Sequence, residues 1–317
     1  SENLTNCASH RRFKDCPRCK ERTAPAIIAE VNAAIEAGVH RGNPNARVIV
    51  WDWGWDDKWA EDIIAHLPKS VCLQSVSEWS KPITRGGIKT TVGEYSLSAV
   101  GPGPRATKHW ALAKQAGLRT VAKVQLNNTW EISPLPYLPV MDLVAEHCAN
   151  LASAGVDGMM LSWSLGGYPS PNLEIARRFS ENPSLSKETV LDALARSRFG
   201  PSGAADARKA WTAFSDAFRE YPFNGSVVYD CPIQMGPANL LYAAPTNYRA
   251  TMTGIPYDDL TRWRGPYPAE VFANQFAKIA SGWKEGIALL ERAVEKTPAD
   301  KLADARAELG IARAGLC

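Results

Sequence analysis

The sequence has no long hydrophobic run and little excess charge, and these two absences exclude several classes of protein. Hydrophobic residues make up 45% of the 317 positions. No uninterrupted apolar stretch reaches the roughly 20 residues that cross a bilayer. Lys and Arg number 36 against 33 Asp and Glu, which gives a formal net charge of +3. We therefore expect neither a membrane span nor a nucleic-acid partner.

Cysteine is also scarce, and two common catalytic motifs are missing. Seven scattered cysteines are too few for a fold held together by disulfides. No Gly-rich phosphate loop follows any expected strand, and this excludes the commonest nucleotide-binding function of α/β proteins. The sequence lacks a Gly-x-Ser-x-Gly turn, and four of its five histidines fall in or beside expected helices, so we do not expect nucleophilic serine chemistry.

Short apolar runs alternate with helical patterns along the first half of the chain. The expected strands are 47–51, 71–76, 120–124 and 156–161. The expected helices are 25–38, 58–67, 105–116 and 140–154. Such alternation is typical of an α/β fold with a parallel sheet, either doubly wound or a TIM barrel, and the missing phosphate loop favours the barrel.

Residues 1–180 are therefore expected to form about four βα units, the C-terminal half of a TIM-type (β/α) barrel. The first half would precede Ser1, where the sequence shows neither an initiator Met nor a signal peptide, so no compartment is assigned. Residues 181–317 are expected to be mostly α-helical, with an irregular connector near 221–266. The expected helices there are 187–198, 204–220, 268–296 and 298–314, the last capped by Thr297. The sequence does not indicate an oligomeric state.

Tryptophan stands beside polar residues at the end of every expected strand. Because ligands of barrels bind at the C-terminal ends of the strands, these residues predict a tryptophan-lined cleft for a carbohydrate, stacked on indole rings. The expected sugar-binding residues are Trp51, Trp53, Trp79, Asn127, Asn128, Trp130, Trp163 and Tyr168. The alternative is that the tryptophans fill the core of the barrel and that their polar neighbours are ordinary loop residues.

Hydrolysis of a glycosidic bond usually requires two carboxyl groups, one protonated and one ionised. Glu2 and Glu78 are the candidates for the general acid, and Asp52 is the candidate for the second carboxylate; Glu131 is a further acidic residue after a strand. Glu78 directly follows an apolar strand and precedes Trp79. Its alternative role is an ion pair with Lys81 or Arg85, and the alternative for Asp52 is to cap the following helix.

Four residues near the start have the spacing of a structural zinc site. Cys16 and Cys19 are arranged as in a zinc knuckle, and Cys7 with His10 would complete four tetrahedral ligands. A pair of free thiols under a loop is the alternative. Basic residues surround the motif, but a single knuckle without a basic remainder does not favour a zinc ribbon that binds nucleic acid.

Several short motifs carry a resemblance to a known group of enzymes. Ser1-Glu2-Asn3, then the Cys16–Cys19 motif before a helix, then the strand end 51–55 (WDWGW) resemble the second half of the barrel in glycoside hydrolases related to family 20 hexosaminidases and to α-glucuronidases. The stretch 194–200 (LARSRFG) is similar to the helical region that follows the barrel in those proteins. The resemblance implies that Glu2 lies just past the fourth barrel strand, where such families often place the acid/base. Family 20 has an adjacent Asp-Glu pair, and this chain has Ser1-Glu2.

The pattern and the resemblance together predict a glycosidase that uses carboxyl acid/base catalysis and acts on a carbohydrate. No cofactor is required for this chemistry, although a structural zinc remains a hypothesis. The alternative, from a different class, is a non-catalytic carbohydrate-binding protein on a degenerate glycosidase barrel.

Overall fold

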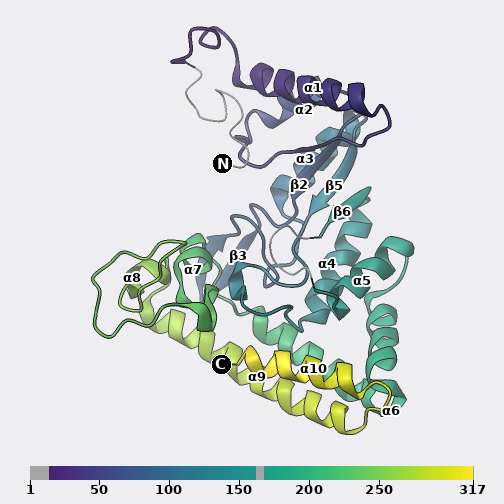
Figure 1. Ribbon diagram of the computed structural model, residues 1–317, viewed down its shortest axis with the longest axis vertical. Coiled ribbons are helices and arrows are strands. Elements are labelled where there is room, and N and C mark those ends of the chain that lie inside the picture. Colours follow the sequence, from purple (N-terminus) through teal and green to yellow (C-terminus); the bar gives the residue numbers. More distant parts are fainter. Residues whose placement is uncertain (1–13, 162–167, 317) are drawn as a thin grey trace. The chain divides into compact units, whose positions relative to one another are not determined.

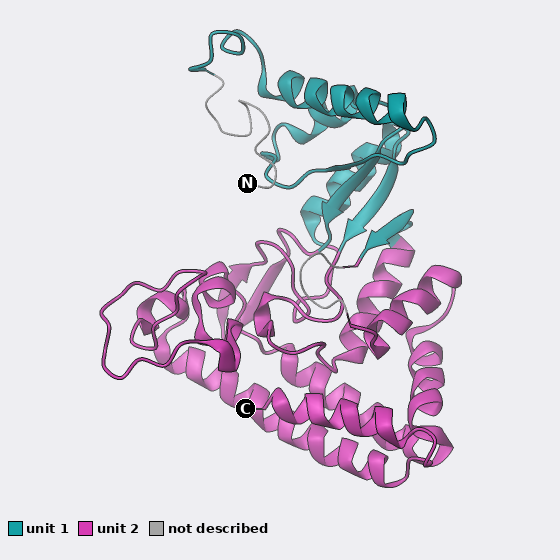
Figure 2. Cartoon of the chain, viewed as in Figure 1, with its two compact units in different colours: residues 1–77, 103–123, 154–160 teal, residues 78–102, 124–153, 161–317 magenta. Residues whose placement is uncertain are grey.

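The computed structural model describes residues 14–161 and 168–316, which form two compact units assembled from several separate stretches of chain (Figures 1 and 2). Unit 1 consists of residues 1–77, 103–123 and 154–160, and unit 2 consists of residues 78–102, 124–153 and 161–317. Among the described helices, none is long and apolar enough to cross a membrane. Each unit is described below by itself.

Unit 1 contains a four-stranded parallel sheet with the order β1-β2-β5-β6. Its strands are β1 (Ile49–Trp51), β2 (Cys72–Val76), β5 (Arg119–Lys123) and β6 (Gly158–Met160). The four expected strands and their parallel arrangement are therefore confirmed. Within the described residues, β1 and β6 are open edges and the sheet closes into no barrel, so the structure confirms the α/β class but not the TIM-type architecture.

Three helices of unit 1 form at the expected places. They are α1 (Ala24–Gly42), α2 (Ala60–His66) and α3 (Pro104–Gln115). The Thr23 side chain caps α1 by accepting the N–H of Ala26, and α3 packs against β2 and β5. Branched aliphatic side chains of α1 and α2, such as Ile28 and Ile63, are buried with Leu73 of β2 in one core.

Unit 2 begins with a β-hairpin that the sequence analysis missed. Strands β3 (Pro82–Arg85) and β4 (Ile88–Thr91) pair antiparallel around Gly86 and Gly87, whose φ angles of +53° and +78° suit a two-residue turn. None of the strands expected from the sequence covers this segment. Its few apolar side chains did not distinguish a hairpin exposed on one face from a loop.

Helices make up most of unit 2 (Figure 1). They are α4 (Met141–Ala154, with the last residue in unit 1), α5 (Pro171–Glu181), α6 (Lys187–Phe218), α7 (Gly225–Asp230), α8 (Leu260–Trp263), α9 (Ala269–Glu295) and α10 (Leu302–Ala314). Short 3-10 turns are η1 (Trp130–Ile132), η2 (Pro232–Gln234) and η3 (Gly236–Ala238). Outside α7, α8 and these turns, residues 221–266 are irregular.

Two boundaries in this helical region differ from the prediction. The expected helices 187–198 and 204–220 form one element, α6, with a kink where Gly200 has φ +70° before Pro201. The expected cap Thr297 is wrong, because α10 starts only after Lys301. The Thr297 hydroxyl instead donates to the carbonyl of Ala293 in the last turn of α9 (2.8 Å).

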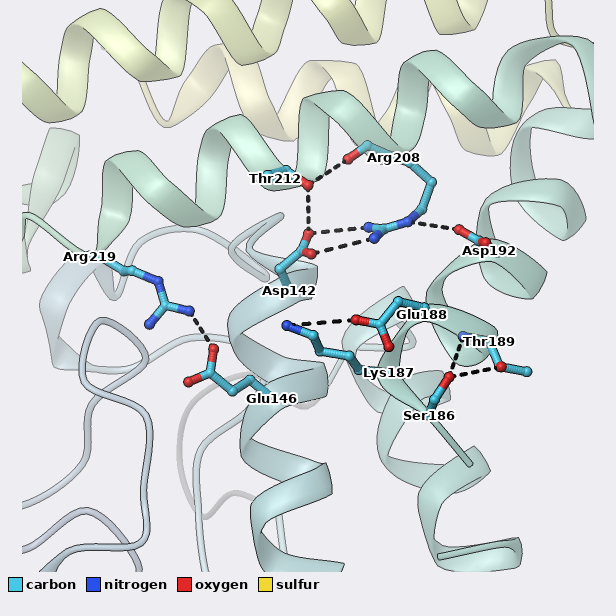
Figure 3. Close-up of polar contacts among 10 residues, drawn as sticks. All are labelled: Asp142, Glu146, Ser186, Lys187, Glu188, Thr189, Asp192, Arg208, Thr212 and Arg219. Atoms are coloured by element: carbon cyan, nitrogen blue, oxygen red, sulfur yellow. Dashed lines mark hydrogen bonds and ion pairs between the residues drawn. The ribbon is translucent and has the colours of Figure 1, made fainter. Parts of the chain in front are cut away.

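Helices α6 and α9 pack along each other, and α10 packs against both (Figure 1). Gly286 permits close contact, since a Cβ there would lie 2.4 Å from Cε1 of Phe214. The Trp283 indole N–H donates to the carbonyl of Ala312, which ties α10 to α9 (2.7 Å). On the other side of α6, Asp142 of α4 accepts hydrogen bonds from Arg208 (Figure 3).

Candidate functional site

Several residues predicted for the site lie outside the described part of the chain. They are Glu2, Cys7, His10 and Trp163. The remaining predicted residues are divided between the two units, with Trp51, Asp52 and Trp53 in unit 1. Glu78, Trp79, Asn127, Asn128, Trp130 and Tyr168 are in unit 2.

Asp52 follows β1 and is completely buried in a polar cluster of unit 1. Its Oδ2 accepts hydrogen bonds from the Ser75 hydroxyl and from Nδ1 of His109, both at 2.6 Å. Its Oδ1 lies 3.1 Å from Nη1 of the buried Arg105. The carboxylate therefore joins β1, β2 and α3, and it does not cap the helix that follows, whose N-cap is Trp59.

The partners of Asp52 were missed by the sequence analysis. Arg105 and His109 are four residues apart on α3, so both face the same side of that helix. The spacing of four residues between Arg105 and His109 is the feature of the sequence that could have indicated this polar cluster. The neighbouring tryptophans, Trp51 and Trp53, are partly exposed, with ring centroids 6.1 Å apart and planes at 44°.

Glu78 is also completely buried, and it lies beside a histidine. Nδ1 of His147, on α4, lies 3.4 Å from Oε1 of Glu78. Burial, and after it the charge of Lys81, lowers the pKa of His147 to about 3, so this imidazole is neutral at neutral pH. The next residue, Trp79, is partly exposed.

Asn127 and Asn128 are buried and shape the loop in which they lie. The Asn127 amide donates to the carbonyl of Tyr168 (2.8 Å), and the Asn128 amide donates to the carbonyl of Leu135 (2.5 Å). Tyr168 itself is 58% exposed. Both side-chain amides therefore stabilise the backbone of unit 2 through these hydrogen bonds.

Glu131 is completely buried and satisfied by several donors. It accepts hydrogen bonds from the Thr129 hydroxyl (2.7 Å), the Ser96 hydroxyl (2.8 Å) and the Leu97 N–H (2.7 Å). These contacts fix the segment 96–98 against the start of η1. The Glu131 carboxylate therefore connects two loops of unit 2.

Three partly exposed residues of unit 2 form a cluster that was not predicted as a whole. Glu94, Trp130 and Tyr229, named here the aromatic–acid group, come from the loop after β4, from η1 and from α7. The Tyr229 hydroxyl donates to the Glu94 carboxylate. The rings of Trp130 and Tyr229 have centroids 6.1 Å apart and planes at 52°. The sequence analysis predicts only Trp130 as a sugar-binding residue, because Glu94 and Tyr229 do not follow an expected strand of the sheet.

The proposed metal ligands are described only in part. Cys16 and Cys19 are half-buried, and a turn joins them through a hydrogen bond from the Cys19 N–H to the Cys16 carbonyl (3.1 Å). Over residues 14–161 and 168–316, no group of three or more His, Cys, Asp or Glu is arranged to hold a metal ion. The other two predicted ligands, Cys7 and His10, lie outside the described residues.

Comparison of the chain with protein-family models, with curated proteins and with solved structures finds no match. Unit 2 holds a buried carboxyl group beside a neutral imidazole, Glu78 and His147, and the partly exposed aromatic–acid group. A buried acid is suited to proton transfer, and aromatic rings with a carboxylate are suited to a polyhydroxylated or charged ligand.

Proposed function

We propose that the protein is a glycoside hydrolase in which Glu78 is the general acid. The parallel sheet of unit 1 would be the C-terminal half of a (β/α) barrel, since its strands are neighbours in the order in which they follow along the chain. Trp79 and Trp130, both partly exposed, would stack on sugar rings. The substrate is a carbohydrate, and the reaction requires no cofactor.

The observation that carries this proposal is the burial of Glu78 beside neutral His147. A general acid must keep its proton near neutral pH, and enclosure away from water is the means by which glycosidases achieve this for a carboxyl group. His147 brings no positive charge to the contact at neutral pH, since burial and Lys81 lower its pKa to about 3.

The second carboxyl group of the mechanism is assigned by proposal to Glu2 or Asp52. Asp52 is paired with buried Arg105 and bonded to His109, and these contacts suit an orienting role. Glu2 follows from the resemblance alone.

A non-catalytic carbohydrate-binding protein is the second candidate, and one observation favours it. Asp52 and Glu131 both accept several hydrogen bonds from their own chain, which suits structural carboxylates. A protein with the aromatic rings but without a working carboxyl pair would bind sugars and release them unchanged.

A structural zinc bound by Cys7, His10, Cys16 and Cys19 also remains a proposal. The backbone turn between Cys16 and Cys19 supports it, because two thiolates separated by two residues can bind one ion only if the chain turns between them. The ion would stabilise the segment before α1 and would take no part in hydrolysis.

The test of function is hydrolysis of a panel of aryl α- and β-glycosides, including N-acetylhexosaminides and glucuronides, by the full chain and by Glu78→Gln. Loss of turnover by about 100-fold or more in Glu78→Gln would support the general acid. The matched control is Glu188→Gln on α6, an exposed acid that should leave the rate unchanged. Sugar binding that depends on Trp79, with no turnover of any glycoside, would favour the binding protein.

A further inference from the structure

Unit 2 contains a cavity of about 690 Å³ that the proposed hydrolysis does not use. The cavity is bounded by α9, by the end of α10 and by the segments around η1, η2 and η3. Cavities that hold small molecules commonly measure about 300–1,000 Å³. The volume therefore suits a small ligand.

The lining of the cavity is apolar and rich in aromatic rings. Its described residues include four aromatic side chains and no charged one; the aromatic residues are Tyr221, Tyr257, Phe276 and Trp283. The rings of Tyr221 and Phe276 meet edge to face, with centroids 5.7 Å apart and planes at 80°. A charged ligand would lose its hydration here without gaining an opposite charge, so the lining favours an uncharged one. Because rings attract each other through their edges and faces, it also favours an aromatic ligand over an aliphatic chain.

The walls of the cavity are held in place by hydrogen bonds within unit 2. On the side of α9 and α10, the Trp283 indole N–H donates to the carbonyl of Ala312 (2.7 Å). On the side of η1, the Asn128 amide donates to the carbonyl of Leu135 (2.5 Å). A ligand would therefore enter a preformed site and would have little of the chain to order.

Tyr221 brings a buried hydroxyl group to the wall of the cavity. The residue is completely buried, and its hydroxyl makes no hydrogen bond to the part of the chain that the structure describes. Buried hydroxyl groups usually have a partner, because an unsatisfied one is costly. Burial also raises the pKa of Tyr221 well above its ordinary value, so the hydroxyl keeps its proton and can donate it. An oxygen atom of a ligand would supply the acceptor.

We infer that this cavity binds an uncharged aromatic molecule with an oxygen acceptor for the Tyr221 hydroxyl, such as an aryl ketone. The inference does not depend on the proposed action on carbohydrates.

The test measures binding of two neutral probes of similar shape to the full chain. One is 2-acetylnaphthalene, which has a carbonyl acceptor, and the other is 2-isopropenylnaphthalene, which has a CH₂ group in place of the oxygen. Each competes with N-phenyl-1-naphthylamine, whose fluorescence reports occupancy of an apolar site. Tyr221→Phe should weaken binding of the ketone about fivefold and leave binding of the hydrocarbon unchanged.

A second variant tests whether the probes occupy the cavity. Ala280 of α9 lines it, so Ala280→Phe should fill it and reduce binding of both probes by at least tenfold. The matched control is Ala277→Phe, which adds the same ring at an exposed position of α9 and should bind both probes as the wild type does. Circular dichroism would check that each variant is folded, and Tyr221→Phe tests the inference even if Ala280→Phe does not fold.

Three results would overturn the inference. Failure of both probes to bind, or binding unchanged in folded Ala280→Phe, would mean that the cavity is not their site. An equal effect of Tyr221→Phe on the two probes would reject the hydrogen bond to the ligand. Tighter binding of 1-dodecanol than of either naphthalene would reject an aromatic ligand in favour of an aliphatic chain. Hydrolysis of glycosides is measured separately, so none of these results bears on the glycosidase proposal.

Discussion

Three acidic side chains that follow strands in the sequence, Asp52, Glu78 and Glu131, are all fully buried, yet their surroundings differ. Asp52 has a cationic partner, Arg105, and Glu131 accepts several neutral donors. Glu78 lies beside an imidazole that is neutral at neutral pH. Because the tertiary structure gives each acid different neighbours, equal positions in the sequence do not imply equal chemistry.

At the residue scale, we expect Asp52→Ala to lower the stability of unit 1 by about 3 kcal/mol, because it removes the buried carboxylate that Arg105 and His109 contact and leaves Arg105 with the exposed carboxylate of Asp57. Urea unfolding followed by a probe in unit 1 would measure this. The double variant Asp52→Ala/Arg105→Met should recover part of the loss. A single variant as stable as the wild type would contradict the structural role of Asp52.

His147 should make the stability of unit 2 depend on pH. Its pKa is lowered to about 3 in the folded protein. As the pH falls below the ordinary histidine pKa of about 6.5, the unfolded chain takes up a proton that the folded imidazole does not, so this group lowers stability between about 6.5 and 3. From pH 7 to pH 5 we expect a loss of about 2 kcal/mol from this residue.

The measurement compares wild-type protein with His147→Gln by urea unfolding at both pH values. The pH-dependent loss should be smaller in His147→Gln by about 2 kcal/mol, since glutamine does not titrate. His66→Gln is the matched control, because the His66 side chain is exposed. The same pH dependence in all three proteins would show that His147 is not buried in its neutral form.

At the scale of secondary structure, the contact between α6 and α9 depends on glycine. A Cβ at Gly286 would lie 2.4 Å from Phe214, whereas a Cβ at Gly310 of α10 would meet nothing within 4 Å. We expect Gly286→Ala to destabilise unit 2 by about 1–3 kcal/mol through overpacking. Gly310→Ala should stabilise it by about 0.5–1 kcal/mol, because alanine favours a helix.

Thermal unfolding of the two glycine variants, followed by circular dichroism, tests this contact. Both substitutions add the same methyl group to a helix, so only its surroundings differ. A stabilising effect at both positions would mean that α6 and α9 are not in close contact at Gly286.

Helix and strand positions followed well from local patterns, with informative exceptions. The expected helix 25–38 begins within one residue of the start of α1, whose N-cap is Thr23. The predicted cap Thr297 was wrong, because its hydroxyl bonds backward to Ala293 and not forward into α10. The sequence analysis missed the hairpin β3–β4 because its two strands pair with each other but show no regular alternation of apolar residues.

At the scale of the whole molecule, the zinc hypothesis states that a bound metal ion stabilises the segment before α1. If the four ligands bind zinc, purified protein should contain about one equivalent of metal, and a strong chelator should remove it with loss of stability. Cys16→Ser should lower the zinc content, and Cys72→Ser, at a buried thiol of β2, should not. Metal-free protein with rapidly alkylated Cys16 and Cys19 would reject the site.

The sequence by itself determined the α/β class, the four parallel strands and most helices, because periodicity, caps and turn residues act over a few positions. It did not decide whether the sheet belongs to a barrel, since β1 and β6 are open edges in the described residues. Barrel closure depends on strands beyond this sheet.

Only the tertiary structure decided what each acidic residue contacts. Ser75 and His109, which bond to Asp52, are 23 and 57 positions away in the chain. Tyr229 is 135 positions from Glu94. Local pattern carries no information over such separations, because hydrogen bonds and ring contacts between distant segments form only when packing brings those segments together.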